Sequence, residues 1–457
     1  MIEFLKQKLG ACKVAILGFG REGQSSYSLI RQAFPETSLL IADSGPGIRS
    51  HPLLAADSNI VFYTGDDYLE VLDHCDLVMK SPGVRINHLS LGVEHSKILS
   101  QTSLFLEKYG KQVIGITGTK GKSTTSSLIQ HIIGLSGRDS CLVGNIGSPA
   151  FHFTDRIKED TLIVFELSSH QLEYTTASPH TAVLLNLFQE HLDAYPSYQA
   201  YQLAKLNIAN YQDEDDFLIY HSSDNLVQGH ISAPGNRARL FPFSLSLQQR
   251  PGVFITENSI FFSDGRNERA VWKLEQKRYL KGEHNLKNIM AAIGACVLNG
   301  ISDETIREGI LTFKGLEHRL EYVGENRLIH FYNDSIATIP EATIEAIKSL
   351  PNVDTVILGG FDRGIDYSQL ADFLAASQVR NLVLLGAAGK RIGECLQSTG
   401  THPQKLFYIN RFDFLKEIVF RETRPGYSCL LSPAAASYDE FANFEERGKR
   451  FRELVRS

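Results

Sequence analysis

The stretch from Val113 to Thr125, VIGITGTKGKSTT, constrains the fold of this chain more than any other segment. A short apolar strand leads into a glycine-bearing turn that ends in Lys122, and Ser123 and Thr124 open a helix. Such a turn aims backbone N–H groups inward, at the positive end of a helix dipole, and so forms a cradle for phosphate oxygens. The segment therefore predicts a strand–turn–helix unit of an α/β fold with ATP bound at its turn.

Within this turn, Lys122 would reach the β- and γ-phosphates, and the Ser123 hydroxyl would coordinate Mg²⁺. The strict pattern has about four residues between its glycines, whereas Gly118 and Gly121 enclose only Thr119 and Lys120. The alternative is an ordinary turn with a surface lysine. The strand, the Gly-Lys-Ser order and the helix together favour the phosphate site. The expected ATP contacts of the loop are Gly118, Thr119, Lys120, Gly121, Lys122, Ser123 and Thr124.

Length and charge limit the class of protein. At roughly 100–200 residues per domain, 457 residues predict three domains. With 46 basic and 52 acidic residues, the net charge of -6 argues against a nucleic-acid or anionic-membrane partner. The N-terminus lacks the apolar core of a signal peptide, and no later apolar run approaches the roughly 20 residues that cross a bilayer. We therefore expect a cytoplasmic monomer that acts on small molecules.

The first hundred residues predict a βαβ unit with a glycine-rich turn. A strand over 13–19 is followed by a helix over 22–34 and by a second strand that ends at Asp43. The turn carries G-x-G-x-x-G, formed by Gly18, Gly20 and Gly23. This is a dinucleotide fingerprint, but its glycines chiefly report close backbone approach to a pyrophosphate, which a UDP-sugar also carries. A tight turn without any ligand remains a third interpretation.

Strand and helix patterns divide the chain into three α/β domains. Residues 1–107 predict a Rossmann-like domain, in which the turn Ser81-Pro82-Gly83 follows a buried strand at the edge where open sheets bind ligands. Residues 108–314 predict a central ATPase-like domain with a mixed sheet, because a strand-rich stretch over 217–279 follows the phosphate loop. Residues 315–457 again alternate strands and helices, which predicts a second Rossmann-like domain.

Three polar side chains are candidates for a metal site beside the phosphates. Glu166 ends an apolar strand, where a carboxylate would serve the oxygen-preferring Mg²⁺. His191 follows another apolar strand, although an isolated histidine is more often structural than a ligand. Lys205 lies on a predicted helix over 198–210, where a lysine is by default a solvated surface charge. Position alone does not decide its role.

A series of motifs along the whole chain resembles the Mur ligases, the ATP-dependent amino-acid ligases of peptidoglycan precursor synthesis. The resemblance is greatest to the branch that adds glutamate to UDP-N-acetylmuramoyl-L-alanine. The motifs are GTKGKST (118–124), GNIGSP (144–149), ELSSHQLE (166–173), N-x-x-x-EHLD (186–193), AKL (204–206), GEHNLKN (282–288), LEHRLE (316–321), FYNDS (331–335) and LSPAAASYDEFANFEERGKRF (431–451).

The resemblance implies a role for each matching residue. It implies that Lys122, His191 and Lys205 are catalytic, and that Lys205 is carbamylated by CO₂ and so becomes an acidic metal ligand. The two expected Mg²⁺ sites would be served by Ser123, Glu166, His191 and Lys205. Further nucleotide contacts would come from Asn285 and Asn288 at the adenine and from Arg319 and Asp334 of the third domain. The UDP substrate would contact Gly18, Phe19, Gly20, Arg21, Asp43, Ser81, Gly83 and Asn145.

The resemblance also implies a mechanism. ATP would phosphorylate the alanine carboxylate to an acyl phosphate, and the glutamate amine would then displace phosphate. Catalysis of phosphoryl transfer is mainly positioning and electrostatic stabilisation. Acyl phosphates hydrolyse readily, so we expect the third domain to close over the site and exclude water.

The glutamate site departs from the pattern of this branch at two positions. Where lysines are expected, the chain has Ile336 and Arg363. Arginine still binds a carboxylate, but with a different reach and geometry. Loss of a cation beside a chiral dicarboxylate leaves both D-glutamate and L-glutamate open, because a related branch adds the L-enantiomer. The remaining contacts with the amino acid would be Thr338, Arg363, Ser437, Tyr438 and Phe444.

Three other functions fit parts of the sequence. A folylpolyglutamate synthase-like ligase shares the phosphate loop and the carbamylated lysine, but it lacks an N-terminal UDP-binding unit. The glycine fingerprint alone would fit an NAD-dependent dehydrogenase. A non-catalytic nucleotide sensor is disfavoured by the presence of Lys122, Glu166, His191 and Lys205 together.

Overall fold

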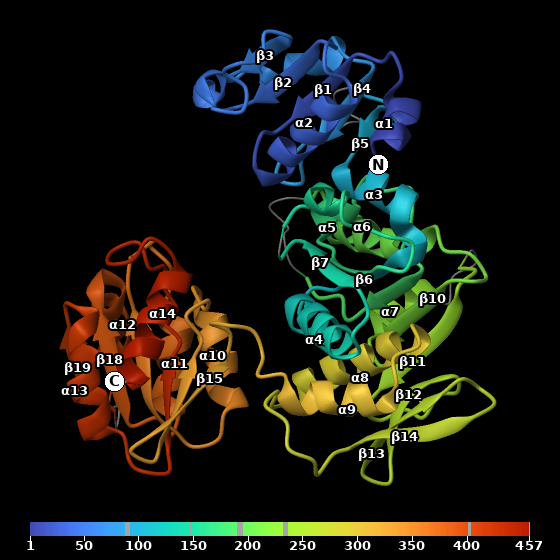
Figure 1. Ribbon diagram of the computed structural model, residues 1–457. Helices are drawn as coiled ribbons and strands as arrows, with labels where there is room; N and C mark the ends of the chain where they lie inside the picture. Colours follow the sequence, from blue (N-terminus) through green and yellow to red (C-terminus); the bar gives the residue numbers. More distant parts are fainter. Residues whose placement is uncertain (87–91, 147, 190–194, 232–235, 401–403, 457) are drawn as a thin grey trace. The chain divides into compact units, whose positions relative to one another are not determined.

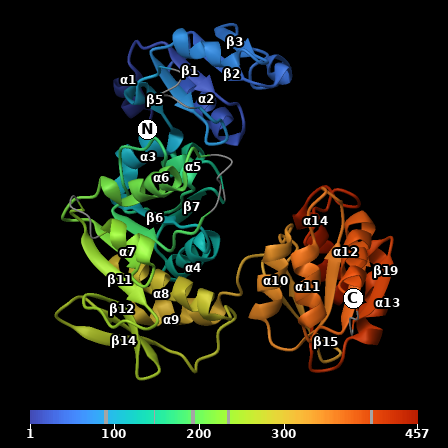
Figure 2. The same ribbon diagram turned by 180° about the vertical axis from the view of Figure 1, so that it is seen from behind.

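The computed structural model describes residues 1–86, 92–146, 148–189, 195–231, 236–400 and 404–456. The strands form three separate sheets with helices on their faces, as Figures 1 and 2 show. The chain divides into two compact units, Met1–Gln276 with Lys287–Leu311, and Lys277–Leu286 with Thr312–Ser457. Among the described residues, no helix is both long and apolar enough to span a bilayer.

The N-terminal sheet is a five-stranded parallel sheet in the order β3-β2-β1-β4-β5. Its strands are β1 (Val14–Leu17), β2 (Leu39–Asp43), β3 (Ile60–Thr64), β4 (Leu77–Lys80) and β5 (Ile98–Leu99). Its helices are α1 (Ile2–Leu9) and α2 (Arg21–Ala33). Val14 and Ile16 pack with α1 and α2, whereas Ala15 and Leu17 pack in a cluster on the other face, as strand alternation requires. The predicted βαβ unit is confirmed.

The central sheet has nine strands in the order β14-β13-β12-β11-β10-β9-β6-β8-β7. The strands are β6 (Val113–Thr117), β7 (Ser140–Gly144), β8 (Leu162–Glu166), β9 (Thr181–Leu184), β10 (Phe217–His221), β11 (Arg239–Ser244), β12 (Gly252–Thr256), β13 (Ser259–Ser263) and β14 (Glu268–Lys273). The pairs β12–β13 and β13–β14 are antiparallel and the others are parallel, so the predicted mixed sheet is confirmed. The helices are α4 (Lys122–Leu135), α5 (Ser169–Leu172), α6 (Tyr198–Asn210), α7 (Asn225–Ile231), α8 (Glu283–Leu298) and α9 (Asp303–Thr312).

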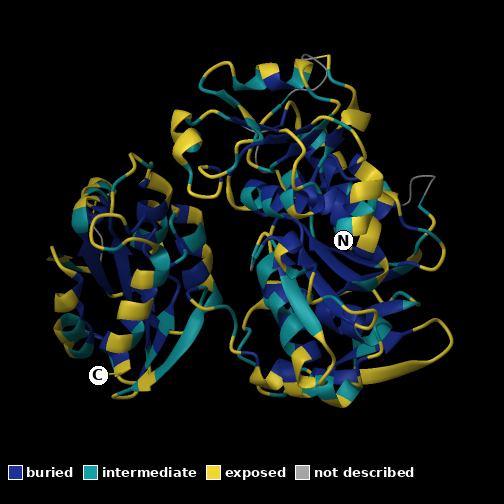
Figure 3. Ribbon diagram, turned by 45° about the horizontal axis from the view of Figure 1, so that its top comes forward, coloured by how far each residue is buried: buried dark blue, intermediate teal, exposed yellow. Residues whose placement is uncertain are grey.

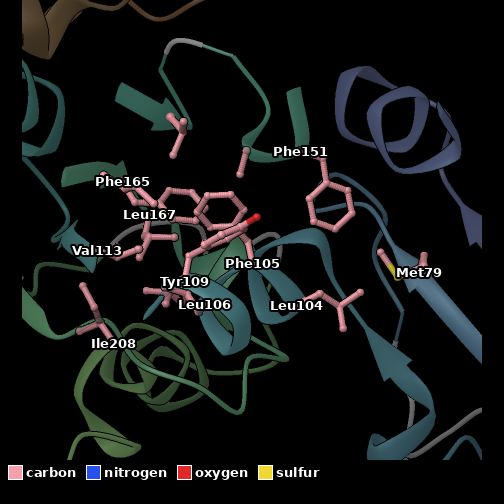
Figure 4. Packing of buried hydrophobic residues seen from close by; sticks show 14 of the residues in the cluster. Met79, Leu104, Phe105, Leu106, Tyr109, Val113, Phe151, Phe165, Leu167 and Ile208 are labelled. Carbon is pink, nitrogen blue, oxygen red and sulfur yellow. The ribbon is translucent and has the colours of Figure 1, made fainter. Parts of the chain in front are cut away.

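Helix α3 (Gln101–Tyr109) joins these two sheets into one hydrophobic core. Its side chains lie between Met79 of β4 and Phe165 of β8, as Figure 4 shows. The rings of Phe105 and Phe165 meet edge to face with centroids 5.5 Å apart. The predicted domain boundary at residue 107 therefore falls inside a helix that packs on both sides.

The C-terminal sheet has six strands in the order β15-β16-β20-β17-β18-β19, and only its β15–β16 pair is antiparallel. The strands are β15 (Glu321–Asn326), β16 (Ile329–Asn333), β17 (Val353–Gly359), β18 (Asn381–Leu385), β19 (Lys405–Ile409) and β20 (Ser428–Leu431). One face carries α10 (Pro340–Ser349), α11 (Ser368–Ala376) and α12 (Gly386–Ser398), and the other carries α13 (Leu415–Glu422) and α14 (Phe444–Arg456). Figure 3 shows these strands buried between helices whose outer faces are exposed. This doubly wound arrangement confirms the predicted Rossmann-like fold.

Candidate active site

The phosphate loop runs from the end of β6 to the start of α4, and two of its glycines are sterically required. Gly118 has φ 154° and Gly121 has φ 89°, a region that residues with side chains rarely adopt. A Cβ on Gly118 would lie 2.9 Å from the Leu185 Cβ, and a Cβ on Gly121 would overlap the side-chain oxygen of Asn288. The loop is therefore closely packed against the segment after β9 and against α8. Asn288 lies at this loop, as its predicted nucleotide role requires.

Asn186 stabilises the conformation of the phosphate loop through three hydrogen bonds. Its side-chain oxygen accepts from the Lys120 N–H at 2.8 Å, and its amide donates to the Lys120 carbonyl at 3.0 Å. Its own carbonyl accepts from the Thr119 N–H at 3.0 Å. The Thr119 side chain is also engaged, because its hydroxyl lies 2.9 Å from the Tyr201 hydroxyl. These bonds fix the backbone of the loop independently of any ligand.

Two lysines converge on the loop carbonyls. The Lys122 ammonium donates to the carbonyls of Gly118 and Thr119 at 2.9 and 3.0 Å. Lys205 approaches from α6, is only 2% exposed, and donates to the same Gly118 carbonyl at 2.9 Å. The default interpretation of Lys205 as a surface charge is therefore wrong. Its ammonium lies inside the site, 5.0 Å from the centroid of the Tyr201 ring.

Glu166 lies at the end of β8 beside the start of α4, and its side chain is completely buried. One carboxylate oxygen accepts from the Ser123 hydroxyl at 3.2 Å and from the Asn145 amide at 2.8 Å. The other accepts from the Ser126 hydroxyl at 3.4 Å. A buried carboxylate beside a serine hydroxyl is the hard oxygen set that Mg²⁺ prefers, so these residues fit the expected ion. Asn145 contacts this carboxylate.

His191 lies outside the described residues, so its predicted place at the metal is not observed. Among the described residues, no group of three or more histidine, cysteine, aspartate or glutamate side chains could hold a metal ion.

The glycine turn of the N-terminal sheet is also closely packed. Gly18 has φ 87°, and a Cβ there would overlap Val84 and lie 3.1 Å from the Ser81 Cβ. The Ser81 hydroxyl donates to the Gly18 carbonyl at 2.7 Å, and Asp43 accepts from the Phe19 N–H at 2.8 Å. The structure therefore brings Gly18, Phe19, Asp43 and Ser81 together at the carboxyl edge of the sheet.

Of the other predicted contacts with the UDP substrate, Gly20 and Arg21 follow Phe19 in this turn and Gly83 comes shortly after Ser81, whereas Asn145 lies beside Glu166. Gly20 caps α2, which begins at Arg21. Arg21 lines a cleft with Gln24, Ser28, Leu53, Ser148, Pro149 and His152. The cleft lies between α2 and the segment that follows β7. Asn145 is the first residue of that segment. A Cβ on Gly83 would meet open space, so steric contact does not explain that glycine.

The remaining nucleotide residues belong to the second compact unit. The Asn285 amide donates to the Lys281 carbonyl at 2.8 Å. Asp334 is 5% exposed, and its carboxylate accepts from the Ser432 hydroxyl at 2.8 Å and from the Leu320 N–H at 3.1 Å. Burial raises the pKa of Asp334 to about 7, although these bonds and the nearby Arg319 act in the opposite direction.

The residues predicted to bind glutamate are connected through two arginines. Arg363 donates to the Thr338 carbonyl at 2.8 Å. Arg447 is 2% exposed and donates to the Ser335 hydroxyl and carbonyl and to the carbonyls of Ala435 and Ala436. It thereby joins FYNDS to the segment that precedes Ser437 and Tyr438. The Ser335 hydroxyl in turn donates to the Phe444 carbonyl at 2.8 Å.

Comparison with known proteins identifies this architecture. Residues 116–296 match the model of the Mur ligase middle domain. A UDP-N-acetylmuramoylalanine–D-glutamate ligase of Symbiobacterium thermophilum is 35% identical over 397 residues, which cover 86% of each chain. One of Acetivibrio thermocellus is 32% identical over 460 residues, covering 99% of this chain and 98% of that protein. The chain belongs to the Mur ligase family. It is an ATP-dependent ligase.

A solved structure supports the fold of this Mur ligase. MurF ligase of Thermotoga maritima, determined in complex with ADP, matches 97% of this chain and 95% of its own with a TM-score of 0.56 and 14% identity. At that identity the likeness concerns the fold alone.

Sequence reasoning assigned no role to several polar residues that shape the site of this Mur ligase. Asn186 belongs to the N-x-x-x-EHLD motif, and its place directly after β9 is the signal that could have identified it as a loop support. Ser126 lies one helical turn after Ser123, so a shared face of α4 could have predicted its contact with Glu166. Arg447 gave no local signal of its contact with Ser335, which lies 112 positions away in the sequence.

Proposed function

We propose that this Mur ligase joins D-glutamate to UDP-N-acetylmuramoyl-L-alanine in peptidoglycan precursor synthesis. The observation that carries the proposal is the cluster of Lys122, Lys205, Ser123 and Glu166 around one phosphate loop, in a chain that also carries a glycine turn suited to a pyrophosphate. The names of relatives that match most of this chain support D-glutamate as the amino acid.

The chemistry proceeds in two steps. A carboxylate oxygen of the alanyl group attacks the γ-phosphorus, and ADP leaves. The glutamate amine then attacks the acyl carbon and loses a proton, and inorganic phosphate leaves with the former carboxylate oxygen. Lys122 would offset the negative charge of the transferring phosphoryl group, and the ordered loop N–H groups would hold its oxygens.

Ser123 and Glu166 would hold Mg²⁺ together with His191 and a carbamate on Lys205. Bound Mg²⁺ neutralises phosphate charge and fixes the orientation of the phosphates. Before any carbamate forms, Lys205 is already inside the site, with its ammonium on the Gly118 carbonyl. The ammonium would lose one proton to give the neutral amine, and reaction of that amine with CO₂ would release a second proton, so that an anion replaces a cation at the same place.

An isotope experiment tests the reaction and its intermediate together. The UDP substrate is labelled with ¹⁸O in the alanyl carboxylate and incubated with Mg-ATP and either D- or L-glutamate. We expect product and ¹⁸O-labelled phosphate with D-glutamate only. Phosphate release that does not depend on the UDP substrate would refute the proposed reaction, unlabelled phosphate would refute the acyl phosphate, and preference for L-glutamate would refute the enantiomer.

The role of Lys205 has its own test. We expect Lys205→Ala to lower kcat at least 100-fold, a loss of roughly 2.7 kcal/mol of transition-state stabilisation, and we expect short-chain carboxylates to restore part of the activity. Lys158→Ala is the control, because Lys158 is an exposed lysine of the same central domain to which no ligand contact is assigned. Full activity of Lys205→Ala would exclude a metal-ligand role.

A further inference from the structure

A cluster of charged side chains surrounds one buried lysine where the N-terminal sheet meets the segment around α5. Lys80 is the last residue of β4, and its side chain is 3% exposed. Its ammonium lies 3.8 Å from a carboxylate oxygen of Glu173 and 5.2 Å from the centroid of the Tyr174 ring. Burial lowers the pKa of Lys80, and the charges of Glu173 and Glu22 oppose that shift. A charge in this position is costly unless it is paired.

Glu22 provides the second carboxylate of the cluster. It lies in the first turn of α2, and one of its oxygens accepts from the Gln171 amide at 2.6 Å. Its other oxygen is buried and has no hydrogen-bond partner among the described residues. Burial raises the pKa of Glu22, while Gln171 and the Lys80 charge act in the opposite direction.

The cluster adjoins two elements of the candidate site, the glycine turn of the N-terminal sheet and the segment after β8. On one side, Lys80 directly precedes Ser81, whose hydroxyl holds the Gly18 carbonyl of the glycine turn. On the other side, the Gln171 side chain accepts from the Ser168 N–H at 3.0 Å and completes the capping box of α5. Helix α5 begins at Ser169, shortly after the metal-site residue Glu166. The hydrogen bonds from Gln171 to Glu22 and from Ser168 to Gln171 thus link the first turn of α2, which follows the glycine turn, to the segment after β8.

Stability alone does not account for this arrangement. The apolar cluster around α3 already joins the two sheets, and well-packed apolar residues usually stabilise a buried site at least as well as an ion pair does. Apolar burial has no preferred direction, whereas hydrogen bonds and ion pairs favour one alignment of the groups that they join. The cluster is therefore suited to fixing alignment between the two sheets.

We propose that Lys80, Glu22, Glu173 and Gln171 are positioning residues that align the glycine turn with the end of β8, so that the alanyl carboxylate meets the γ-phosphate. The inference rests on the proposed function. None of these residues is among those predicted to contact a substrate. Misplacement by about 1 Å at a reacting pair costs on the order of 100-fold in rate.

Steady-state kinetics with each substrate varied in turn test the proposal. We expect Lys80→Met to lower kcat by about 10- to 100-fold and to raise KM for the UDP substrate, with KM for ATP and glutamate within twofold of the wild type. Lys80→Arg keeps the charge and should recover part of kcat. Lys8→Ala is the matched control, because Lys8 forms an exposed ion pair with Glu107 between α1 and α3.

A charge exchange gives a second test that does not depend on Lys80. Gln171→Glu alone places two carboxylates in contact, and we expect the largest loss of kcat. Glu22→Gln with Gln171→Glu restores one carboxylate and one amide and retains an acceptor for Ser168, so kcat should recover at least tenfold over Gln171→Glu alone. Melting temperatures are measured for every variant.

The outcomes separate the two proposals. A wild-type enzyme without UDP-dependent phosphate release would refute the proposed function and the inference together. A normal wild type whose Lys80→Met and Gln171→Glu variants melt earlier but keep their kinetic constants would overturn the inference alone. So would the absence of any recovery in the charge-exchange variant.

Discussion

Replacing Asn186 with alanine should weaken nucleotide binding without affecting the UDP substrate. The change removes two side-chain hydrogen bonds to the Lys120 backbone. Because these bonds are partly exposed, each contributes roughly 0.5–1 kcal/mol, and the loop should lose about 1–2 kcal/mol of its preference for the phosphate-binding conformation. A loss of that size corresponds to a roughly 5- to 30-fold rise in the Kd for nucleotide.

Isothermal titration with Mg-ADP and separately with the UDP substrate measures this effect. Asn299→Ala is the control, because it also removes two bonds of one amide, to the Thr181 hydroxyl and the Ala295 carbonyl, at a place remote in sequence from the loop. If Asn186→Ala and Asn299→Ala bind ADP equally well, the loop does not depend on Asn186 and the reasoning is refuted.

Three further perturbations test other parts of the structure. Gly18→Ala should lower the melting temperature and raise KM for the UDP substrate at least tenfold, because the φ of Gly18 is 87° and the added methyl group would overlap Val84. Gly20→Ala is the control: its Cβ would meet open space, so this variant should melt like the wild type. Glu166→Gln preserves size and one acceptor oxygen but removes the charge and replaces the other acceptor with a donor, so phosphate release should fall more than 100-fold, or about 2.7 kcal/mol, with KM for glutamate unchanged. Because burial raises the pKa of Asp334 to about 7 from 3.8, the protonated group stabilises the fold at low pH, and that contribution is lost as the pH rises through 7. Urea unfolding between pH 4 and 7 should therefore show wild type losing stability relative to Asp334→Asn, and parallel pH curves would contradict this.

Local pattern was sufficient to predict the elements of the fold. The helix expected over 198–210 is α6, Tyr198–Asn210, because its apolar residues recur at helical spacing and a serine caps it. The strands that precede the two glycine turns were predictable for a similar reason, since they are short apolar runs bounded by glycine. In both cases the signal lies within about fifteen residues of sequence.

The site was predictable where a polar residue stands at the end of a strand or the start of a helix, within a recognisable motif. Ser123 and Glu166 were assigned to one metal site, and the structure places them 3.2 Å apart. The pairing of Glu22 with Gln171 joins residues 149 positions apart, and single-sequence patterns carry no information on such a contact. The helix position of Lys205 alone predicts exposure, whereas the tertiary fold buries it, so only the family resemblance assigned it to the site.

The core shared through α3 determines how these ligases can be recombined. A chimaera that takes its nucleotide-sugar module from another member of the family must also take α3, because this helix belongs to the core that the two sheets share. A junction at residue 107 would split that helix between two parents. The better junction follows α3, near Gly110, where the helix has ended and β6 has not begun. Modules joined there would keep α3 whole, but Glu22 would then meet Gln171, and Phe105 would meet Phe165, across two parents, so these pairs must be matched as well.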